Sequence, residues 1–253
     1  MLSEAQVARY HEDGFVVPDY RVADDTLADI KDRHDRLIAR HPEFTDYCPA
    51  VLAHDLGFLN VARDPAIVAM VGQVLGPDFA LWNSSFFAKP AHVGRKTPWH
   101  QDGEYWPIRP LATCTVWIAV DASTTENGCL RVLPGSHRPR KLFHHQRNDD
   151  PTLSLNQQLV DAEAPEERAV DIVLAPGQMS LHDVYLAHGS EANRSGRPRR
   201  GMTLRFMPTT SVFDRALASE MARANGLRDH ADRTLFLMSG TDRSGGNDFR
   251  MRL

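Results

Sequence analysis

The sequence has few cysteines, and their arrangement excludes two kinds of structural site. Only three occur in 253 residues, Cys48, Cys114 and Cys129, and none forms a C-x-x-C pair. This pattern argues against a disulfide framework and against a thiolate zinc site, so we expect buried, reduced thiols. Any metal must then be bound by histidine and carboxylate side chains.

The sequence also lacks a long apolar run and a strong charge of one sign. No stretch approaches the about 20 apolar residues of a membrane span, and Met1 is followed by a polar, acidic segment, so we expect a cytoplasmic protein. The net charge of -4 creates no field suited to nucleic acid or to anionic membranes. A small molecule is therefore the expected partner, and the sequence does not indicate an oligomeric state.

The order of the predicted elements indicates a mainly β protein with flanking helices. Residues 1–76 are predicted to be rich in helix: Ser3 and Gln6 form a capping box, and Asp64-Pro65 begins a later helix. After this part, short β-rich runs separated by Pro, Gly, Asn and Asp predict a jelly-roll core over about 77–210. These runs are 79–87, 113–120, 129–133, 170–174, 179–181 and 201–207.

Two further segments are less regular. Residues 138–168, rich in Arg, His, Asn, Asp and Gln, are predicted to form a long polar insertion, and whether it covers a site as a lid stays open. Residues 211–253 are predicted to be a helical segment followed by a mobile tail rich in Gly and Ser. We expect one domain over 1–253, because barrels of this length commonly form a single domain.

A short motif, His100-Gln101-Asp102, carries the candidate metal chemistry. Residues two apart on a strand project from the same face, so the imidazole and the carboxylate can bind one cation. His188 follows the run 179–181, and a jelly roll can bring it beside the first pair. Two histidines and one carboxylate leave three octahedral positions open, as in non-haem iron oxygenases. The H-x-D motif alone is weak evidence, because it also occurs by chance.

Several arginines follow His188 and precede an apolar strand. Arg197, Arg199 and Arg200 are close in sequence to the hydroxyl group of Ser190. An arginine fork matches a carboxylate bidentately, so one of them can hold the far carboxylate of a dicarboxylate chelator. Spacing alone does not decide which one.

These segments together resemble the phytanoyl-CoA dioxygenase family, within the iron(II) and 2-oxoglutarate dioxygenases that include ectoine hydroxylase. The matching segments are Asp13-Gly14-Phe15, Trp99-His100-Gln101-Asp102, Glu126-Asn127-Gly128-Cys129-Leu130, Pro134-Gly135-Ser136-His137, Ala175-Pro176-Gly177 and His188 through Arg199. The resemblance implies a cupin-like double-stranded β-helix with helices packed on one face. It also implies iron(II) as the metal cofactor, with 2-oxoglutarate and O2 as co-substrates.

The resemblance further implies roles for individual residues. His100, Asp102 and His188 fall on the catalytic metal ligands, Arg199 on the arginine that holds 2-oxoglutarate, and Ser190 on its hydroxyl helper. The other matching positions are Asn83, Trp117 and Lys89 for the co-substrate and Trp106 and Tyr105 for the substrate pocket. Because related halogenases have a small residue where this chain has Asp102, the resemblance favours hydroxylation of a C–H bond, with release of succinate and CO2.

Other polar and aromatic residues are expected to have structural roles, and Arg205 has only a weak claim to the pocket. The residues expected to be structural are the corner residue His137, His182 near the third ligand, the surface-loop pair His144 and His145, and the core aromatics Trp82, Phe86 and Phe87.

Two other functions stay open. The barrel can bind zinc or nickel as a hydrolase or isomerase, which activity without oxygen or 2-oxoglutarate would favour. It can also be a non-catalytic module that holds a small ligand, although the intact set of metal ligands and Arg199 argues against this. The substrate is not predicted; residues 40–60, 138–168 and the tail are the segments expected to select it.

Overall fold

The computed structural model describes residues 1–160, 165–225, 229 and 231–252. The α-helices are α1 (Glu4–Asp13), α2 (Asp24–Arg40), α3 (Leu59–Ala62), α4 (Pro65–Leu75) and α5 (Arg215–Asn225). Short 3-10 helices cover Pro42–Phe44, Val51–Ala53, Leu56–Phe58, Asp102–Tyr105 and Glu166–Arg168.

The strands form two main antiparallel sheets. The seven-stranded sheet has the order β1-β11-β6-β13-β3-β15, with β2 paired to β3, and the four-stranded sheet has the order β10-β7-β12-β4. The strands of the first are β1 (Phe15–Val16), β2 (Tyr47–Cys48), β3 (Phe79–Lys89), β6 (Cys114–Ala119), β11 (Met179–Asp183), β13 (Arg199–Pro208) and β15 (Phe236–Ser239). Those of the second are β4 (Thr97–His100), β7 (Leu130–Val132), β10 (Val170–Ile172) and β12 (His188–Ser190).

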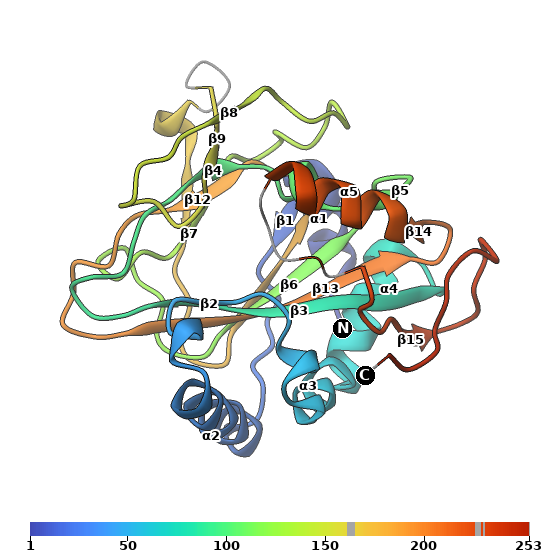
Figure 1. Cartoon of the computed structure of the whole chain (residues 1–253), viewed down its shortest axis with the longest axis horizontal. Coiled ribbons are helices and arrows are strands. Elements are labelled where there is room, and N and C mark those ends of the chain that lie inside the picture. The colour runs from blue at the N-terminus through green and yellow to red at the C-terminus, as the bar shows by residue number, and fades with distance from the viewer. Residues whose placement is uncertain (161–164, 226–228, 230, 253) are drawn as a thin grey trace.

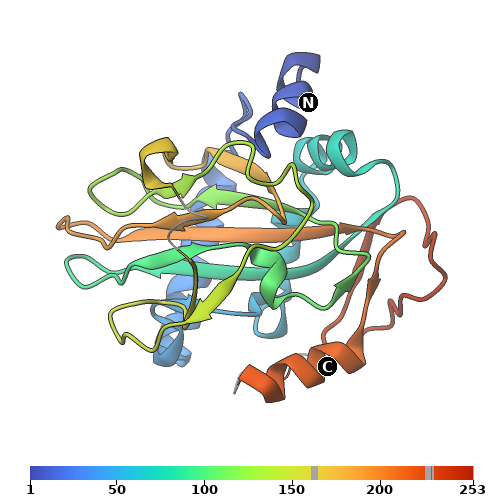
Figure 2. The same cartoon turned by 90° about the horizontal axis from the view of Figure 1, so that it is seen from above.

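Two small hairpins complete the β structure. β5 (Ile108–Arg109) pairs with β14 (Val212–Phe213), and β8 (His145–Arg147) pairs with β9 (Gln157–Leu159). In Figure 1 the second sheet and the β8–β9 hairpin lie on one side of the long strands β3 and β13, while α2 and α3 lie on the other. Figure 2 shows α1 beyond one edge of the long strands and α5 beyond the opposite edge. The predicted jelly roll with helices on one face is confirmed.

The helical layer forms where the sequence predicts it. Ser3 and Gln6 make the predicted capping box, and α1 ends at Gly14, whose φ of 85° is costly for other residues. The carboxylate of Asp64 accepts hydrogen bonds from the first turn of α4, directly before Pro65. Apolar residues at helical spacing then bury one face of each helix against the large sheet; they include Leu27, Ile30, Leu37, Ile67, Met70 and Val71.

The structure shows strands in two flanking segments where the sequence predicts none. In the C-terminal segment the predicted helix is present as α5, β15 then adds to the large sheet, and Arg243 pairs with Asp78 at 2.7 Å. That the tail is mobile stays a prediction. The polar insertion contains the β8–β9 hairpin, and its residues 161–164 lie outside the described part. Sequence patterns missed both β15 and the hairpin because these strands are short and mostly polar or half-exposed.

Two expectations based on absences can be compared with the structure. All three cysteines are buried as thiols, as predicted. No single helix in the described residues is long and apolar enough to cross a membrane; one bent pair, Leu56–Ala62 with Pro65–Leu75, reaches that length and composition only when combined. That the chain forms one domain stays a prediction.

Candidate metal centre

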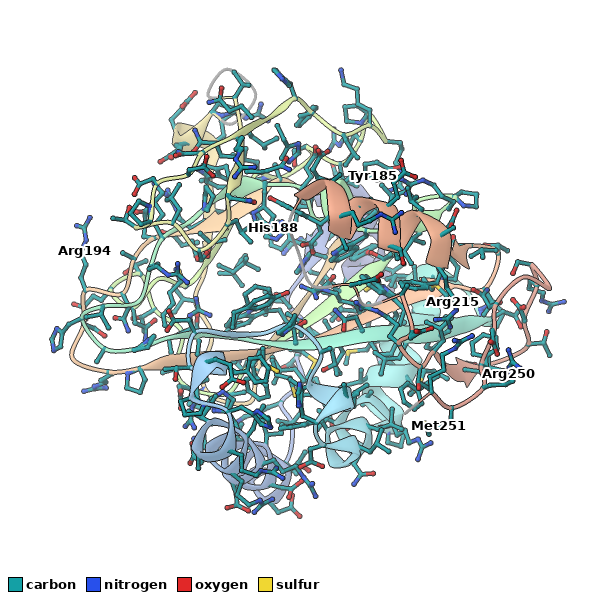
Figure 3. All side chains as sticks on the ribbon, in the orientation of Figure 1. Tyr185, His188, Arg194, Arg215, Arg250 and Met251 are labelled. Atoms are coloured by element: carbon teal, nitrogen blue, oxygen red, sulfur yellow. The ribbon has the colours of Figure 1, made fainter. Side chains whose placement is uncertain are left out.

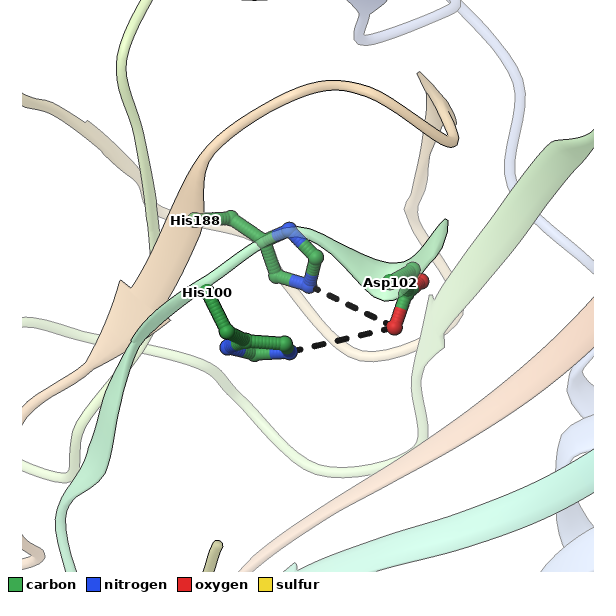
Figure 4. A group of neighbouring side chains, drawn as sticks. All are labelled: His100, Asp102 and His188. Carbon is green, nitrogen blue, oxygen red and sulfur yellow. Dashed lines mark ion pairs between the residues drawn. The ribbon is translucent and has the colours of Figure 1, made fainter. Parts of the chain in front are cut away.

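His100, Asp102 and His188 meet between the two sheets. Each side chain offers one ligand atom, and these three atoms lie within 4.8 Å of one another. The Nε2 atoms of His100 and His188 lie 3.8 and 4.0 Å from the same carboxylate oxygen, Oδ1 of Asp102 (Figure 4). The adjacent strands β4 and β12 place His188 directly opposite His100 in the register, which brings two distant segments of sequence to one point.

One detail of the predicted arrangement is wrong. His100 is the last residue of β4, but Asp102 begins the 3-10 helix Asp102–Tyr105 and is not on the strand. The two side chains still converge because the backbone of Gln101 is extended, with φ of -114° and ψ of 129°, and its buried amide is held on both sides. Its Nε2 donates to the carbonyl of Tyr185 at 2.7 Å, and its Oε1 accepts from the N–H of Phe143 at 2.6 Å.

The two histidines are oriented and neutral, as metal ligands must be. The Nδ1 atom of His100 lies 2.9 Å from the carbonyl of Pro98, and that of His188 lies 2.9 Å from the carbonyl of Leu186. Each Nδ1–H therefore donates to the backbone, which leaves the Nε2 lone pair facing Asp102. Burial lowers the pKa of His100 below its ordinary value and that of His188 to about 3, so neither ring carries a second proton, on Nε2, at neutral pH.

The third ligand remains ionised although it is buried. Burial by itself raises the pKa of Asp102, but contact with His182 and nearby positive charges, among them Arg205, bring the pKa well below its ordinary value. The Nε2 atom of His182 lies 3.7 Å from Oδ2 of Asp102 and does not join the group of three. Two neutral imidazoles and one carboxylate form a donor set that suits divalent iron.

A small pocket of about 50 Å³ opens on one side of the three ligands. Arg199, Ser190 and Trp117 line it, as predicted for residues that contact a co-substrate. The other lining residues include Thr97, Thr115, Leu130, His182, Thr203 and Arg205. The threonines were not predicted, because a threonine on a β-strand is too common in sequences to signal a site.

The geometry distinguishes among the three candidate arginines. Arg197 is exposed, and Arg200 is bound to Asp121 at 2.8 Å and to Asp35 at 2.9 Å. Arg199 is 3% exposed, lies over the ring of Trp117 at 5.3 Å and donates one hydrogen bond to the carbonyl of Phe87. Burial lowers its pKa to about 10, which leaves it charged at neutral pH. Arg199 is therefore the guanidinium available at the end of the small pocket.

Two predicted co-substrate residues lie elsewhere. Asn83 lines the larger cavity, where its amide lies 3.4 Å from Ser85 Oγ. Lys89 is buried opposite Arg199 in the register of β3 and β13, and its Nζ donates to the carbonyl of Arg95. Burial and the charge of Arg199 lower the pKa of Lys89 to about 6. Neither side chain lines the small pocket.

A larger cavity of about 540 Å³ also reaches His100 and Asp102. Tyr105 and Trp106 line it, as predicted for a substrate pocket. Three further residues line the large cavity: Trp82, Phe87 and Arg205. The expectation of a purely structural role is therefore wrong for Trp82 and Phe87. The weak claim of Arg205 to the pocket is supported. Phe86, by contrast, is fully buried in the core, as expected.

The polar insertion and the C-terminal segment form the remaining walls of this cavity. Most residues of the segment Asn148–Asn156, between β8 and β9, line the large cavity. The C-terminal segment adds Phe213, Met221, Ala222 and Arg233 to the lining. His145 is not on a surface loop, since its side chain is 1% exposed and its Nε2 accepts a hydrogen bond from the N–H of Gln101 at 3.1 Å. The insertion therefore supports the turn between two metal ligands. His137 lies away from the ligands, 3.0 Å from the carbonyl of His11, which fits a structural corner.

Comparison with known proteins identifies the family of this site. The family model described as phytanoyl-CoA dioxygenase (PhyH) matches residues 10–201, which include all three ligands and Arg199. The chain belongs to the phytanoyl-CoA dioxygenase family. The predicted family is thus confirmed.

Individual relatives are distant. The chain is 26% identical over 223 residues to the peroxisomal phytanoyl-CoA dioxygenase of Mus musculus, covering 78% of this chain but only 66% of the mouse protein. It is 23% identical over 248 residues to the ectoine dioxygenase of Sphingopyxis alaskensis, covering 88% of this chain and 81% of that protein. The chain therefore spans about two thirds of the mouse enzyme's length.

Solved structures share the fold. The apo non-heme monooxygenase ThoJ has a TM-score of 0.76 at 23% identity, covering 98% of this chain and 88% of its own. EvdO2 from Micromonospora carbonacea, complexed with 2-oxoglutarate, has a TM-score of 0.68 at 23% identity, covering 82% and 91%. These similarities confirm the predicted fold class.

Proposed function

We propose that this family member is an iron(II)- and 2-oxoglutarate-dependent dioxygenase that hydroxylates a C–H bond of a small metabolite. The observation that carries the proposal is the convergence of His100, Asp102 and His188 next to a small pocket that ends at Arg199. Iron(II) bound there, with 2-oxoglutarate and O2, supplies the oxidising power for hydroxylation and releases succinate and CO2. A cytoplasmic location remains a prediction from the sequence alone.

The protein's own residues have three tasks in this function. The triad holds the metal by one face, and the backbone acceptors behind each histidine fix the ring orientation. Arg199 binds the far carboxylate of 2-oxoglutarate through its fork, while Ser190 and Trp117 complete the small pocket. The large cavity, which also reaches His100 and Asp102, would then hold the substrate beside the metal site.

The test is the weak visible band that iron(II) and 2-oxoglutarate form together under nitrogen. We expect the wild-type protein to show it, and Arg199→Met to need about tenfold or more 2-oxoglutarate, because a charge-assisted bidentate contact is lost. Arg197→Met is the matched control, since Arg197 is exposed two residues away. Succinate formation in air, which does not require knowledge of the substrate, follows as a second readout.

The same measurements also distinguish the proposed function from the two alternatives that the sequence left open. A zinc or nickel hydrolase would work without O2 and 2-oxoglutarate, and a binding module would form no succinate. A folded, iron-loaded protein without the band would overturn the proposal. Equal 2-oxoglutarate requirements in the Arg199→Met and Arg197→Met variants would overturn the role of Arg199.

A further inference from the structure

The two oxygens of the Asp102 carboxylate face different histidines. Oδ1 lies 3.8 and 4.0 Å from the Nε2 atoms of the ligands His100 and His188, whereas Oδ2 lies 3.7 Å from Nε2 of His182. Among the basic side chains of the described residues, these three histidines alone come within 4.0 Å of the carboxylate. Oδ1 therefore faces the metal position, and Oδ2 faces a histidine that is not one of the three ligands.

The strand that carries His182 confines it beside this carboxylate. β11 lies between β1 and β6, and His182 pairs in register with Phe15 on one side and Thr115 on the other. The residue is 2% exposed, and its ring lies 5.0 Å from the ring of His188, which Figure 3 shows in the interior of the molecule. The imidazole can rotate about its own bonds, but the backbone behind it is held by the sheet.

The hydrogen-bonding capacity of His182 is unused. Both ring nitrogens are buried, and neither has a hydrogen-bond partner within the described residues. The 3.7 Å between Nε2 and Oδ2 exceeds the about 2.7–3.2 Å of a hydrogen bond, and a small rotation of either side chain closes the difference. The pairing is favourable because a buried N–H and a buried carboxylate oxygen both cost free energy while they are unpaired.

The charge of Asp102 decides which nitrogen of His182 carries the proton. Burial by itself raises the pKa of Asp102, but contact with His182, the strongest of the opposing influences, brings it well below its ordinary value, so the carboxylate is ionised. An Nε2 lone pair would repel this oxygen, whereas an Nε2–H attracts it. His182 therefore carries its proton on Nε2. In His100 and His188 the proton is on Nδ1, which donates to the backbone.

We infer that His182 is a positioning residue of the metal centre, whose Nε2–H donates to Oδ2 of Asp102 and leaves Oδ1 to bind the metal. A carboxylate held in this way presents one oxygen in a fixed orientation. Because its second oxygen is occupied, three octahedral positions stay open for 2-oxoglutarate and O2. The inference rests on the metal site of the proposed function, but not on the reaction that follows metal binding.

Metal affinity measures this role directly. Mn(II) is a suitable probe, because it accepts the same imidazole and carboxylate ligands as iron(II). We expect His182→Phe to bind Mn(II) about tenfold or more weakly than the wild type, since groups that support a metal ligand are worth ten- to hundredfold in affinity. His182→Gln, whose amide keeps an N–H near Oδ2, should recover most of the loss. Calorimetry measures the affinities, and thermal unfolding checks that each variant folds.

The matched control is another buried histidine, replaced in the same way. His34 is 4% exposed, lines neither pocket and also has a buried ring nitrogen without a partner within the described residues, so His34→Phe should leave Mn(II) affinity unchanged. Equal affinity in the wild type and His182→Phe would overturn the inference. Equal weakening in His182→Phe and His182→Gln would also overturn it, because the imidazole would then only fill space.

A different split would assign His182 to the co-substrate. If His182→Phe binds Mn(II) normally but needs more 2-oxoglutarate to form the iron band, His182 contacts 2-oxoglutarate in the small pocket, and its role toward Asp102 is overturned.

A measurement on the wild type covers the case in which the variants do not fold. NMR of isotope-labelled protein loaded with Zn(II), a diamagnetic probe, shows which ring nitrogen of each histidine carries the proton. We expect Nδ1–H in His100 and His188 and Nε2–H in His182. An Nδ1–H tautomer of His182 would overturn the inference.

The two proposals fail separately. Mn(II) binding that depends on His182, without the iron and 2-oxoglutarate band, would leave the positioning role standing and remove the oxygenase function. The band together with Mn(II) binding that is independent of His182 would do the opposite.

Discussion

The small pocket and the large cavity meet at the same metal ligands, yet they are built from different parts of the chain. The small pocket, about 50 Å³, is lined almost entirely by strands of the two sheets, β4, β6, β12 and β13 among them. The large cavity, about 540 Å³, takes much of its wall from the β8–β9 hairpin and from the segment after β13. The difference indicates that the barrel provides the chemistry, whereas added segments select the molecule on which it acts.

The two regions also differ in how they are held. Most strands that line the small pocket are tied on both sides by sheet hydrogen bonds, such as those of β13 with β3 and β6. In the described residues the hairpin is instead joined to the barrel by separate bonds and one isolated bridge, Lys96 with Leu153, among them the bond of Ser154 Oγ to Thr97 Oγ1 at 2.8 Å. Local opening is therefore expected on the side of the large cavity, where no strand ladder has to break.

The largest effect should come from removing a metal ligand. His188→Ala is expected to lower succinate formation by about a hundredfold or more, because even groups that only support a metal ligand are worth ten- to hundredfold. His188 lines the small pocket but not the large cavity, so the shape of the large cavity should change little.

Metal content and succinate formation measure this effect. His11→Ala, a surface histidine on α1, is the control. Retained metal and turnover in His188→Ala would contradict the assignment of the triad.

A buried histidine that lines neither pocket, His34, is expected to make the stability of the fold depend on pH. His34 on α2 is buried against Phe86 at 4.3 Å, and burial lowers its pKa to about 4. The unfolded chain takes up this proton near pH 6.5 while the folded chain does not, so stability is full above 6.5 and is lost as pH falls toward 4. A shift from 6.5 to about 4 corresponds to about 3 kcal/mol.

Urea unfolding at pH 7.5 and pH 4.5 tests this sign. His34→Leu should lose less stability than the wild type over that interval, and His11→Ala should follow the wild type. Identical losses in wild type and His34→Leu would show that His34 is not the responsible group.

The next prediction concerns Gly201, which lies against Trp117, a residue of the small pocket but not of the large cavity. A Cβ at Gly201 would lie 2.1 Å from the indole of Trp117, so Gly201→Ala must displace the ring that lies under Arg199. We expect destabilisation by about 1–3 kcal/mol, typical of overpacking, with weaker 2-oxoglutarate binding and an unchanged large cavity.

The matched control is Gly72→Ala on α4, where the new Cβ would meet Phe79 at an ordinary 3.6 Å and helix propensity favours alanine. Thermal unfolding and the 2-oxoglutarate band distinguish the two variants. Normal 2-oxoglutarate binding in Gly201→Ala would mean that Trp117 does not shape the co-substrate site.

The difference between the barrel strands and the added segments also explains which site residues the sequence could predict. His100, Asp102, His188 and Arg199 belong to a motif whose order and spacing indicate both the fold and the site. Arg233 has no such signal: its place in the cavity depends on how the segment after α5 returns to the sheet edge. The sequence predicts a surface loop for His145, because it lies in the polar insertion next to His144 and adjacent residues on a strand face opposite ways. In the structure it is buried, and its hydrogen bond with Gln101 offsets the cost of that burial.

The smallest effect tests whether the walls of the large cavity move independently. Ser154→Ala removes the side-chain bond to Thr97 but keeps the backbone bond from the Ser154 N–H to the Lys96 carbonyl. One hydrogen bond is worth about 1 kcal/mol, so the local opening equilibrium of the β8–β9 hairpin should rise about fivefold, which hydrogen exchange of its amides would measure.

Ser219→Ala is the control, because it removes one side-chain bond, to Asp229 at 2.6 Å, from the wall that α5 forms. If each wall is attached to the barrel separately, the first variant speeds exchange only in the hairpin and the second only near α5. Faster exchange in both walls from either variant would mean that they open as one unit, and the substrate cavity would then be a single cooperative element. Neither variant should alter exchange in β12 or β13, since those strands owe their stability to the sheets and not to the added segments.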